Sequence, residues 1–174
     1  MRAFASGMLS ALGHSPTIAI RDFSGEADFD PAAPEKASLR LQIRADSLEV
    51  TDDIKSKDRK EMESTMNEKV LESAKYPVIA FETATTSVNQ LGEGRYHVNM
   101  NGTLSLHGET GKIPLAAQIT LSGATMRASG EFTLSQTDFG IKPVNVAGGA
   151  LKLKDELKFA FDVVARRQNG RKQE

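Results

Sequence analysis

The fold is decided by residues 96–107, which read YHVNMNGTLSLH. Apolar residues alternate with polar ones from Tyr96 to Leu106, and Gly102 falls in step with the apolar set. Successive side chains of a β-strand point to opposite faces of the sheet. The alternation therefore predicts a strand with one apolar face and one polar face.

The same alternation recurs in segment after segment. It predicts strands near residues 3–10, 16–23, 26–30, 37–46, 78–88, 95–107, 112–122, 124–135 and 156–165. Short connections favour antiparallel pairing of consecutive strands. Long strands fit a barrel better than a small sandwich, although alternation alone is compatible with both. We therefore expect a mainly β protein, an antiparallel β-barrel of about eight strands that is closed or nearly closed.

Residues 56–74 break the pattern and predict a helical insertion. Met62, Met66 and Val70 recur every four residues and form an apolar stripe. The simplest interpretation is that the stripe packs against the sheet. The alternative is a lid over an apolar guest, because methionine surfaces adapt to irregular shapes. The two are compatible, since a lid packs when it is closed.

Composition narrows the class of protein. The 174 residues suit a single domain, expected over 1–165, followed by a basic, flexible tail over 166–174. The net charge of −1 gives no indication of nucleic-acid binding, and no apolar run is long enough for stable membrane insertion. Residues 1–12 lack the continuous apolar core, roughly 7–15 residues, of a signal peptide. The chain as given is therefore expected to be cytoplasmic.

No motif indicates an enzyme. The chain has no cysteine, and its histidines, His14, His97 and His107, are too scattered along the sequence to suggest a metal site. Serines occur outside any nucleophile-elbow pattern, and the glycine pairs lack the context of a phosphate loop. We expect no catalytic residues, no metal and no cofactor.

Several short motifs, taken in order, resemble the YceI-like family of lipocalin-like barrels associated with polyisoprenoid binding. They are Gly13–Pro16, Phe23–Gly25 leading to Phe29, Lys57–Arg59, Tyr76–Phe81, Gly102–Gly108 and Asp138–Ile141. The resemblance implies an antiparallel barrel with an adjacent helical segment and a long apolar cavity for isoprenoid chains such as those of quinones. It also implies that many relatives are periplasmic, in contrast to the expectation from residues 1–12.

Alternation and resemblance together predict where a guest binds. The expected cavity residues are Leu41, Ile43, Phe81, Tyr96, Val98, Met100, Leu104, Ile119, Phe132, Phe159 and Phe161, with Met62, Met66 and Val70 as the lid. Small residues among the inward positions, such as Gly102 and Gly130, leave two alternatives open. They give room either to a chain-like ligand or to large neighbours that fill the core.

The expected function is non-catalytic binding, sequestration or transport of an isoprenoid-type lipid or another long-chain amphiphile in the barrel lumen. The first alternative is a filled-core barrel that acts as a protein-interaction or structural, stress-related module. An enzyme acting on isoprenoid or acyl substrates is the least favoured. A hydrophobic small molecule is the expected partner, and a homodimer is left open.

Overall fold

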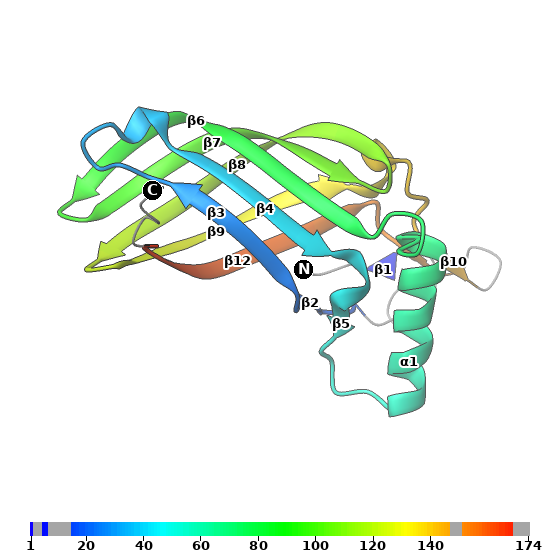
Figure 1. Cartoon of the computed structure of the whole chain (residues 1–174). Helices are drawn as coiled ribbons and strands as arrows, with labels where there is room; N and C mark the ends of the chain where they lie inside the picture. The colour runs from blue at the N-terminus through cyan, green and yellow to red at the C-terminus, as the bar shows by residue number, and fades with distance from the viewer. Residues whose placement is uncertain (2–4, 7–14, 147–150, 169–174) are drawn as a thin grey trace, which may run out of the picture.

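The computed structural model describes residue 1 and residues 5–6, 15–146 and 151–168. His14 and most of the strand expected over 3–10 lie outside the described residues. Figure 1 shows long strands running side by side, with the helical segment at one end. Among the described residues, no helix has the length and apolar character to cross a membrane.

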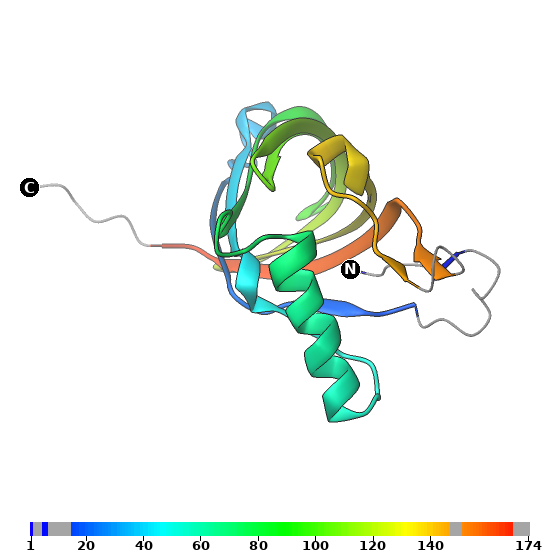
Figure 2. The same cartoon turned by 90° about the vertical axis from the view of Figure 1, so that its right-hand side faces the viewer.

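Seven antiparallel strands form one sheet that curls into a barrel. They are β3 (Phe23–Asp28), β4 (Ser38–Arg44), β6 (Val78–Gly92), β7 (Arg95–Leu106), β8 (Glu109–Ser122), β9 (Thr125–Ser135) and β12 (Glu156–Arg166). Their order across the sheet is β12-β9-β8-β7-β6-β4-β3. Figure 2 looks along the strands and shows them curling around an interior. The predicted mainly β, nearly closed antiparallel barrel is confirmed, with seven strands in this sheet.

Tight turns connect the long strands. β7 and β8 are joined by only His107 and Gly108, whose φ angles are 54° and 81°. Two consecutive residues with positive φ give a hairpin turn whose twist matches that of the flanking strands. Because this turn is so short, β8 begins at Glu109, earlier than the expected strand over 112–122.

The β3–β4 hairpin continues around a corner as a second, smaller pair of strands. β2 (Ile18–Ile20) pairs with β5 (Leu48–Val50), and the turn η2 (Ala45–Ser47) separates β5 from β4. The strand expected over 16–23 is therefore divided at the corner. The last residue of that prediction, Phe23, begins β3, which also contains the first residues of the strand expected over 26–30.

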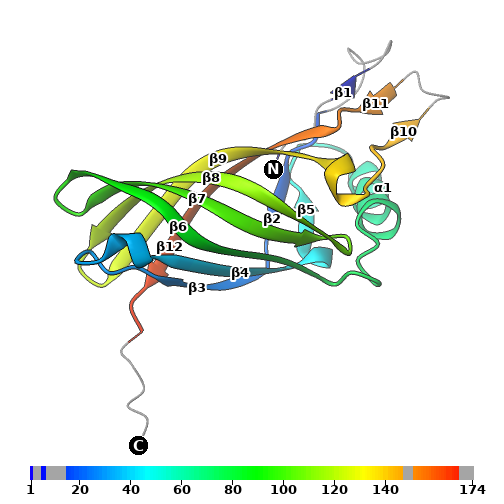
Figure 3. The same ribbon diagram turned by 90° about the horizontal axis from the view of Figure 1, so that it is seen from above.

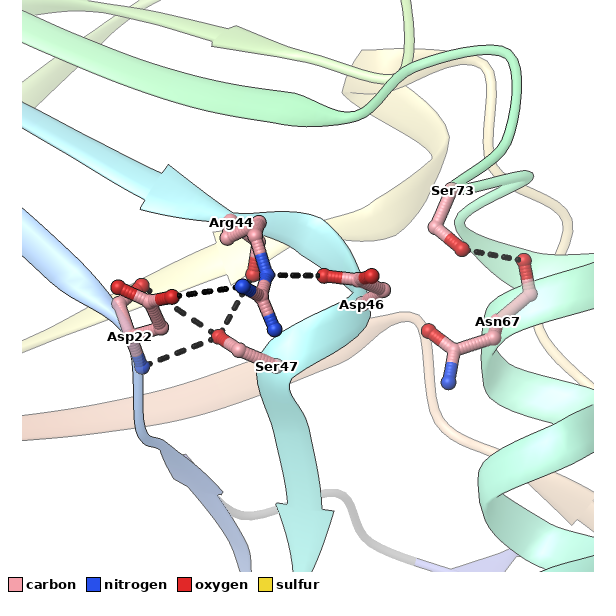
Figure 4. A network of polar contacts seen from close by, with 6 residues as sticks. All are labelled: Asp22, Arg44, Asp46, Ser47, Asn67 and Ser73. Atoms are coloured by element: carbon pink, nitrogen blue, oxygen red, sulfur yellow. Dashed lines mark hydrogen bonds and ion pairs between the residues drawn. The ribbon is translucent and has the colours of Figure 1, made fainter.

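A polar network holds this corner (Figure 4). The Arg44 guanidinium lies 3.0 Å from the Asp22 carboxylate and 2.6 Å from that of Asp46. The hydrogen bond with Asp46, then the charges of Asp46 and Asp22, raise the pKa of Arg44. The Ser47 hydroxyl donates to the Arg44 carbonyl (2.7 Å) and accepts from the Asp22 N–H (3.1 Å). These contacts hold the chain at the corner, where β2 is separated from β3 and β4 is separated from β5.

The helical insertion is shorter than predicted. Helix α1 (Ser56–Thr65) continues into η3 (Met66–Val70), a turn of π-helix, and the Ser73 hydroxyl then donates to the Asn67 carbonyl (Figure 4). Glu72 has a φ of 45°, a left-handed conformation that right-handed helices do not accommodate. The helix expected over 56–74 therefore ends at Val70.

A small sheet lies at the same end of the barrel as α1 (Figure 3). It consists of β1 (Ala5–Ser6), β11 (Leu151–Leu153) and β10 (Asn145–Val146). Two further short turns are η1 (Pro34–Lys36) and η4 (Gln136–Phe139). At the other end, β12 extends to Arg166, one residue beyond the expected boundary, and residues 169–174 of the predicted tail lie outside the described residues.

Candidate functional site: an apolar cavity in the barrel

The inner faces of the strands are apolar because of their two-residue alternation. On β7, Val98 and Met100 are buried, whereas Asn101 between the inward positions Met100 and Gly102 is exposed. Antiparallel pairing places Val98 opposite Ala117 and Met100 opposite Leu115 on β8. The apolar positions of neighbouring strands therefore fall into rows on one side of the sheet.

These rows enclose a cavity of about 1020 Å³. Each strand of the seven-stranded sheet contributes to its lining, as do β2, β5 and the helical segment. The side chains are mostly aliphatic and aromatic, and Phe132 and Phe159 stack with ring centroids 4.7 Å apart. A volume at the upper end of the roughly 300–1,000 Å³ common for ligand sites gives room for a large apolar guest.

Nearly all the predicted cavity residues line this space. They are Leu41, Ile43, Phe81, Val98, Met100, Leu104, Ile119, Phe132, Phe159 and Phe161. The one predicted cavity residue that does not line this space is Tyr96. It is buried, but its ring packs edge-on against Phe29 at a centroid distance of 5.1 Å. Alternation places Tyr96 on the inner side correctly but does not show that Phe29 lies there too.

Two of the inward glycines leave space that a neighbouring aromatic ring occupies. A Cβ on Gly102 would overlap the Phe81 ring, and a Cβ on Gly130 would lie 2.7 Å from Cζ of Phe161. Each missing side chain is therefore replaced by an aromatic ring that lies over the backbone. At these two positions the core is filled, and the cavity is the space that remains beside the rings.

The three predicted lid residues also line the cavity. Met62 lies on α1, and Met66 and Val70 lie on η3, with buried Leu71 just beyond. The π-helical turn inserts one extra residue per turn relative to an α-helix. Packing against the barrel is thus observed, and the function of a lid remains a prediction.

A polar cluster fastens the end of this helical segment to the barrel. His107 Nε2 lies 2.7 Å from the Glu72 carboxylate, and His107 Nδ1 lies 3.3 Å from the Phe139 carbonyl oxygen. The ring of Tyr76 lies against the imidazole, with centroids 4.8 Å apart. Glu72 and His107 are also the two non-glycine residues with positive φ in the described part of the chain. This cluster fixes where η3 meets the β7–β8 turn.

Part of the lining was missed by sequence reasoning. It comes from the corner strands, from the end of β9 and from the segment after it: Ile18, Leu48, Val50, Leu134, Gln136 and Ile141. Gln136 is buried, and its Nε2 donates to the Lys154 carbonyl at 3.0 Å. The corner strands are only three residues long, too short for alternation to be recognised.

Comparison with curated proteins finds relatives at moderate identity. A protein of Pseudomonas savastanoi pv. phaseolicola, described as a UPF0312 protein, is 32% identical over 152 residues, covering 80% of this chain and 71% of the relative. A UPF0312 protein of Azotobacter vinelandii is 29% identical over 147 residues, again covering 80% of this chain and 71% of the relative.

Two solved structures share the fold. BcnA of Burkholderia cenocepacia has a TM-score of 0.68 at 21% identity, covering 85% of this chain and 86% of BcnA. A polyisoprenoid binding domain from Saccharophagus degradans has a TM-score of 0.66 at 15% identity, covering 96% and 92% of the two chains. The YceI-like domain model matches residues 6–165. The chain therefore belongs to the YceI-like family, as the sequence motifs predicted.

Proposed function

We propose that the protein binds an isoprenoid-type lipid or another long-chain amphiphile in the barrel lumen and sequesters or carries it without chemical change. The observation that carries the proposal is the cavity of about 1020 Å³, lined from all seven strands of the sheet by mostly apolar side chains. The structural likeness to a domain described as polyisoprenoid binding supports the same class of ligand.

The hydrophobic effect alone is large enough for useful affinity. A chain of about twenty carbons gains about 16 kcal/mol on burial, at about 0.8 kcal/mol per methylene. A cost of about 8 kcal/mol for association lies within the accepted range. The difference of about 8 kcal/mol corresponds to a dissociation constant near 1 μM. No polar recognition is needed for this affinity.

The first experiment is native mass spectrometry of the purified protein, followed by organic extraction and identification of the lipid. A bound species of single stoichiometry that extracts as an isoprenoid or fatty amphiphile supports the proposal. A clean apo mass that is unchanged after incubation with quinones and fatty acids contradicts it.

A matched pair of variants tests whether the ligand lies in the lumen. Met100→Lys puts an ammonium group into the apolar lining, where an unpaired charge is unfavourable and obstructs the guest. Asn101→Lys adds the same group to the next residue on the exposed outer face. We expect Met100→Lys to lose lipid and Asn101→Lys to retain it. Normal lipid recovery from a folded Met100→Lys protein would count against a lumen site.

The second candidate is a barrel with a filled core that acts as an interaction module. The rings of Phe81 and Phe161, which occupy the space beside Gly102 and Gly130, favour this alternative. Thermal unfolding before and after delipidation distinguishes the two functions. A carrier loses stability when its guest is removed, whereas a filled barrel does not.

A further inference from the structure

The two edges of the barrel sheet are not joined to each other. β3 and β12 stand at opposite ends of the strand order, and no backbone pairing links them in the described residues. Seven antiparallel strands leave the two edge strands running in the same direction. Closing the barrel would therefore need a parallel pair within an otherwise antiparallel sheet. All six residues of β3 are exposed, which agrees with an open edge.

The cavity reaches this open edge. On β8 it is lined by alternate residues, from Ile113 to Ile119, as expected for one face of a strand. On the edge strands it is lined by the consecutive residues 25–28 of β3, followed by Phe29 just beyond the strand, and 160–165 of β12. Neighbouring strand residues point to opposite faces, so a cavity that touches both must extend around the edge. We call the opening between residues 25–29 and 160–165 the lateral slot.

The outward side chains at the slot carry negative charge. Glu26 and Asp28 come from β3, and Asp162 comes from β12. Asp162 is neutralised by an ion pair with Arg127. Glu26 lies opposite Arg40 on β4, whereas Asp28 lies opposite the uncharged Ser38. The free negative charge therefore concentrates toward the Asp28 end of the slot.

The other end of the cavity carries carboxylates as well. Asp58 and Glu61 on α1 line it, and the cationic groups of the described lining are Lys152 on β11 and the N-terminal ammonium of Met1, which donates to the Ile18 carbonyl on β2. The described lining thus has five carboxylates, from Glu26, Asp28, Asp58, Glu61 and Asp162, and two ammonium groups. Because no cationic group of the described residues lines the slot itself, an anionic head group meets net repulsion there.

We propose that the guest keeps its head group at the lateral slot, and that the protein selects amphiphiles with a neutral or cationic head group over anionic ones. The inference rests on the proposed function and names the ligand class. A hydroxyl or carbonyl head group finds hydrogen-bond partners in the unpaired N–H and C=O groups of the edge strands. A cationic head group gains from Asp28 and Glu26, and a phosphate or carboxylate is repelled by them.

The test uses three amphiphiles that share one chain: geranylgeraniol, geranylgeranylamine and geranylgeranyl phosphate. Dissociation constants are measured by calorimetry on the delipidated protein. We expect the alcohol and the amine to bind and the phosphate to bind at least tenfold more weakly than the alcohol. The slot variant Glu26→Gln/Asp28→Asn should bring the affinity for the phosphate close to that for the alcohol. The matched control Asp58→Asn/Glu61→Gln removes two charges at the helical end and should leave the discrimination in place.

The outcomes separate this inference from the proposed function. Equal affinity of the unmodified protein for phosphate and alcohol overturns the inference and leaves lipid binding intact. Rescue of phosphate binding by the control instead of the slot variant places the head group at the helical end, which also overturns it. Failure of all three amphiphiles to bind overturns the inference and, with it, the isoprenoid ligand of the proposed function. Light scattering tests whether a second copy of the chain occupies the slot instead. A dimer that is disrupted by the slot variant and not by the control would show that the slot is an interface between chains, which also overturns the inference.

Discussion

Gly102→Ala is expected to destabilise the protein because the added methyl group would overlap the ring of Phe81. The Cζ and Cε2 atoms of that ring occupy the space where the Cβ would be placed, and both residues are buried. Inserting a methyl group into a packed core costs about 1–3 kcal/mol. Replacing glycine within a strand returns about 0.5–1 kcal/mol. The net loss is about 1 kcal/mol, which lowers Tm by roughly 2–4 °C in a chain of this length.

Phe81→Leu supplies the matched background for a double-mutant cycle. Leucine lacks the two ring atoms that overlap the added methyl, so Gly102→Ala should become neutral or mildly stabilising there. The expected coupling energy is about 1 kcal/mol or more, measured by equilibrium unfolding in urea. If the effects of the two substitutions add within about 0.5 kcal/mol, Phe81 does not fill the space above Gly102 and the reasoning is refuted.

Two further predictions concern β9 and β12. Gly130→Ala should be more destabilising than Gly102→Ala and resist rescue by Phe161→Leu in the same unfolding assay, because a Cβ there would also overlap the backbone carbonyl of Ala116. The hydrogen bond from Arg127 lowers the pKa of Asp162, so the carboxylate contributes stability above the ordinary aspartate range and loses it as pH falls through the lowered value. The difference in unfolding free energy between Asp162→Asn and the unmodified protein should therefore shrink as the pH falls below the ordinary aspartate range, and a constant difference would contradict the ion pair.

The sequence predicted the inner surface well because alternation is a direct consequence of strand geometry. One-sided burial requires period-two patterning, and Val98, Met100 and Ile119 accordingly line the cavity. The pattern does not specify which inward residues touch a cavity and which pack on each other. Tyr96 shows this limit, because its burial depends on Phe29, which lies 67 residues before it in the chain.

The corner of the β3–β4 hairpin was not predictable in the same way. β2 and β5 have three residues each, which is too few for a periodic signal. The bend depends on Arg44, which pairs with Asp46 two residues further along the chain and reaches Asp22 across the hairpin. The contact with Asp22 is long-range in sequence, and single charged residues at exposed positions are too common to indicate it. The cavity residues Leu48 and Val50 were missed for this reason.

The open edge of the barrel depends on a property that alternation cannot supply, the parity of the strand number. An antiparallel sheet of eight consecutive strands brings edges of opposite direction together, and they close with the same hydrogen-bond pattern as the other pairs. With seven strands the edges run in the same direction, so β3 and β12 would need a slanted parallel ladder to close. An expectation of about eight strands describes the inner surface equally well in both cases. Adding or removing one strand therefore decides whether the cavity opens at the side, although it leaves the apolar character of the lining the same.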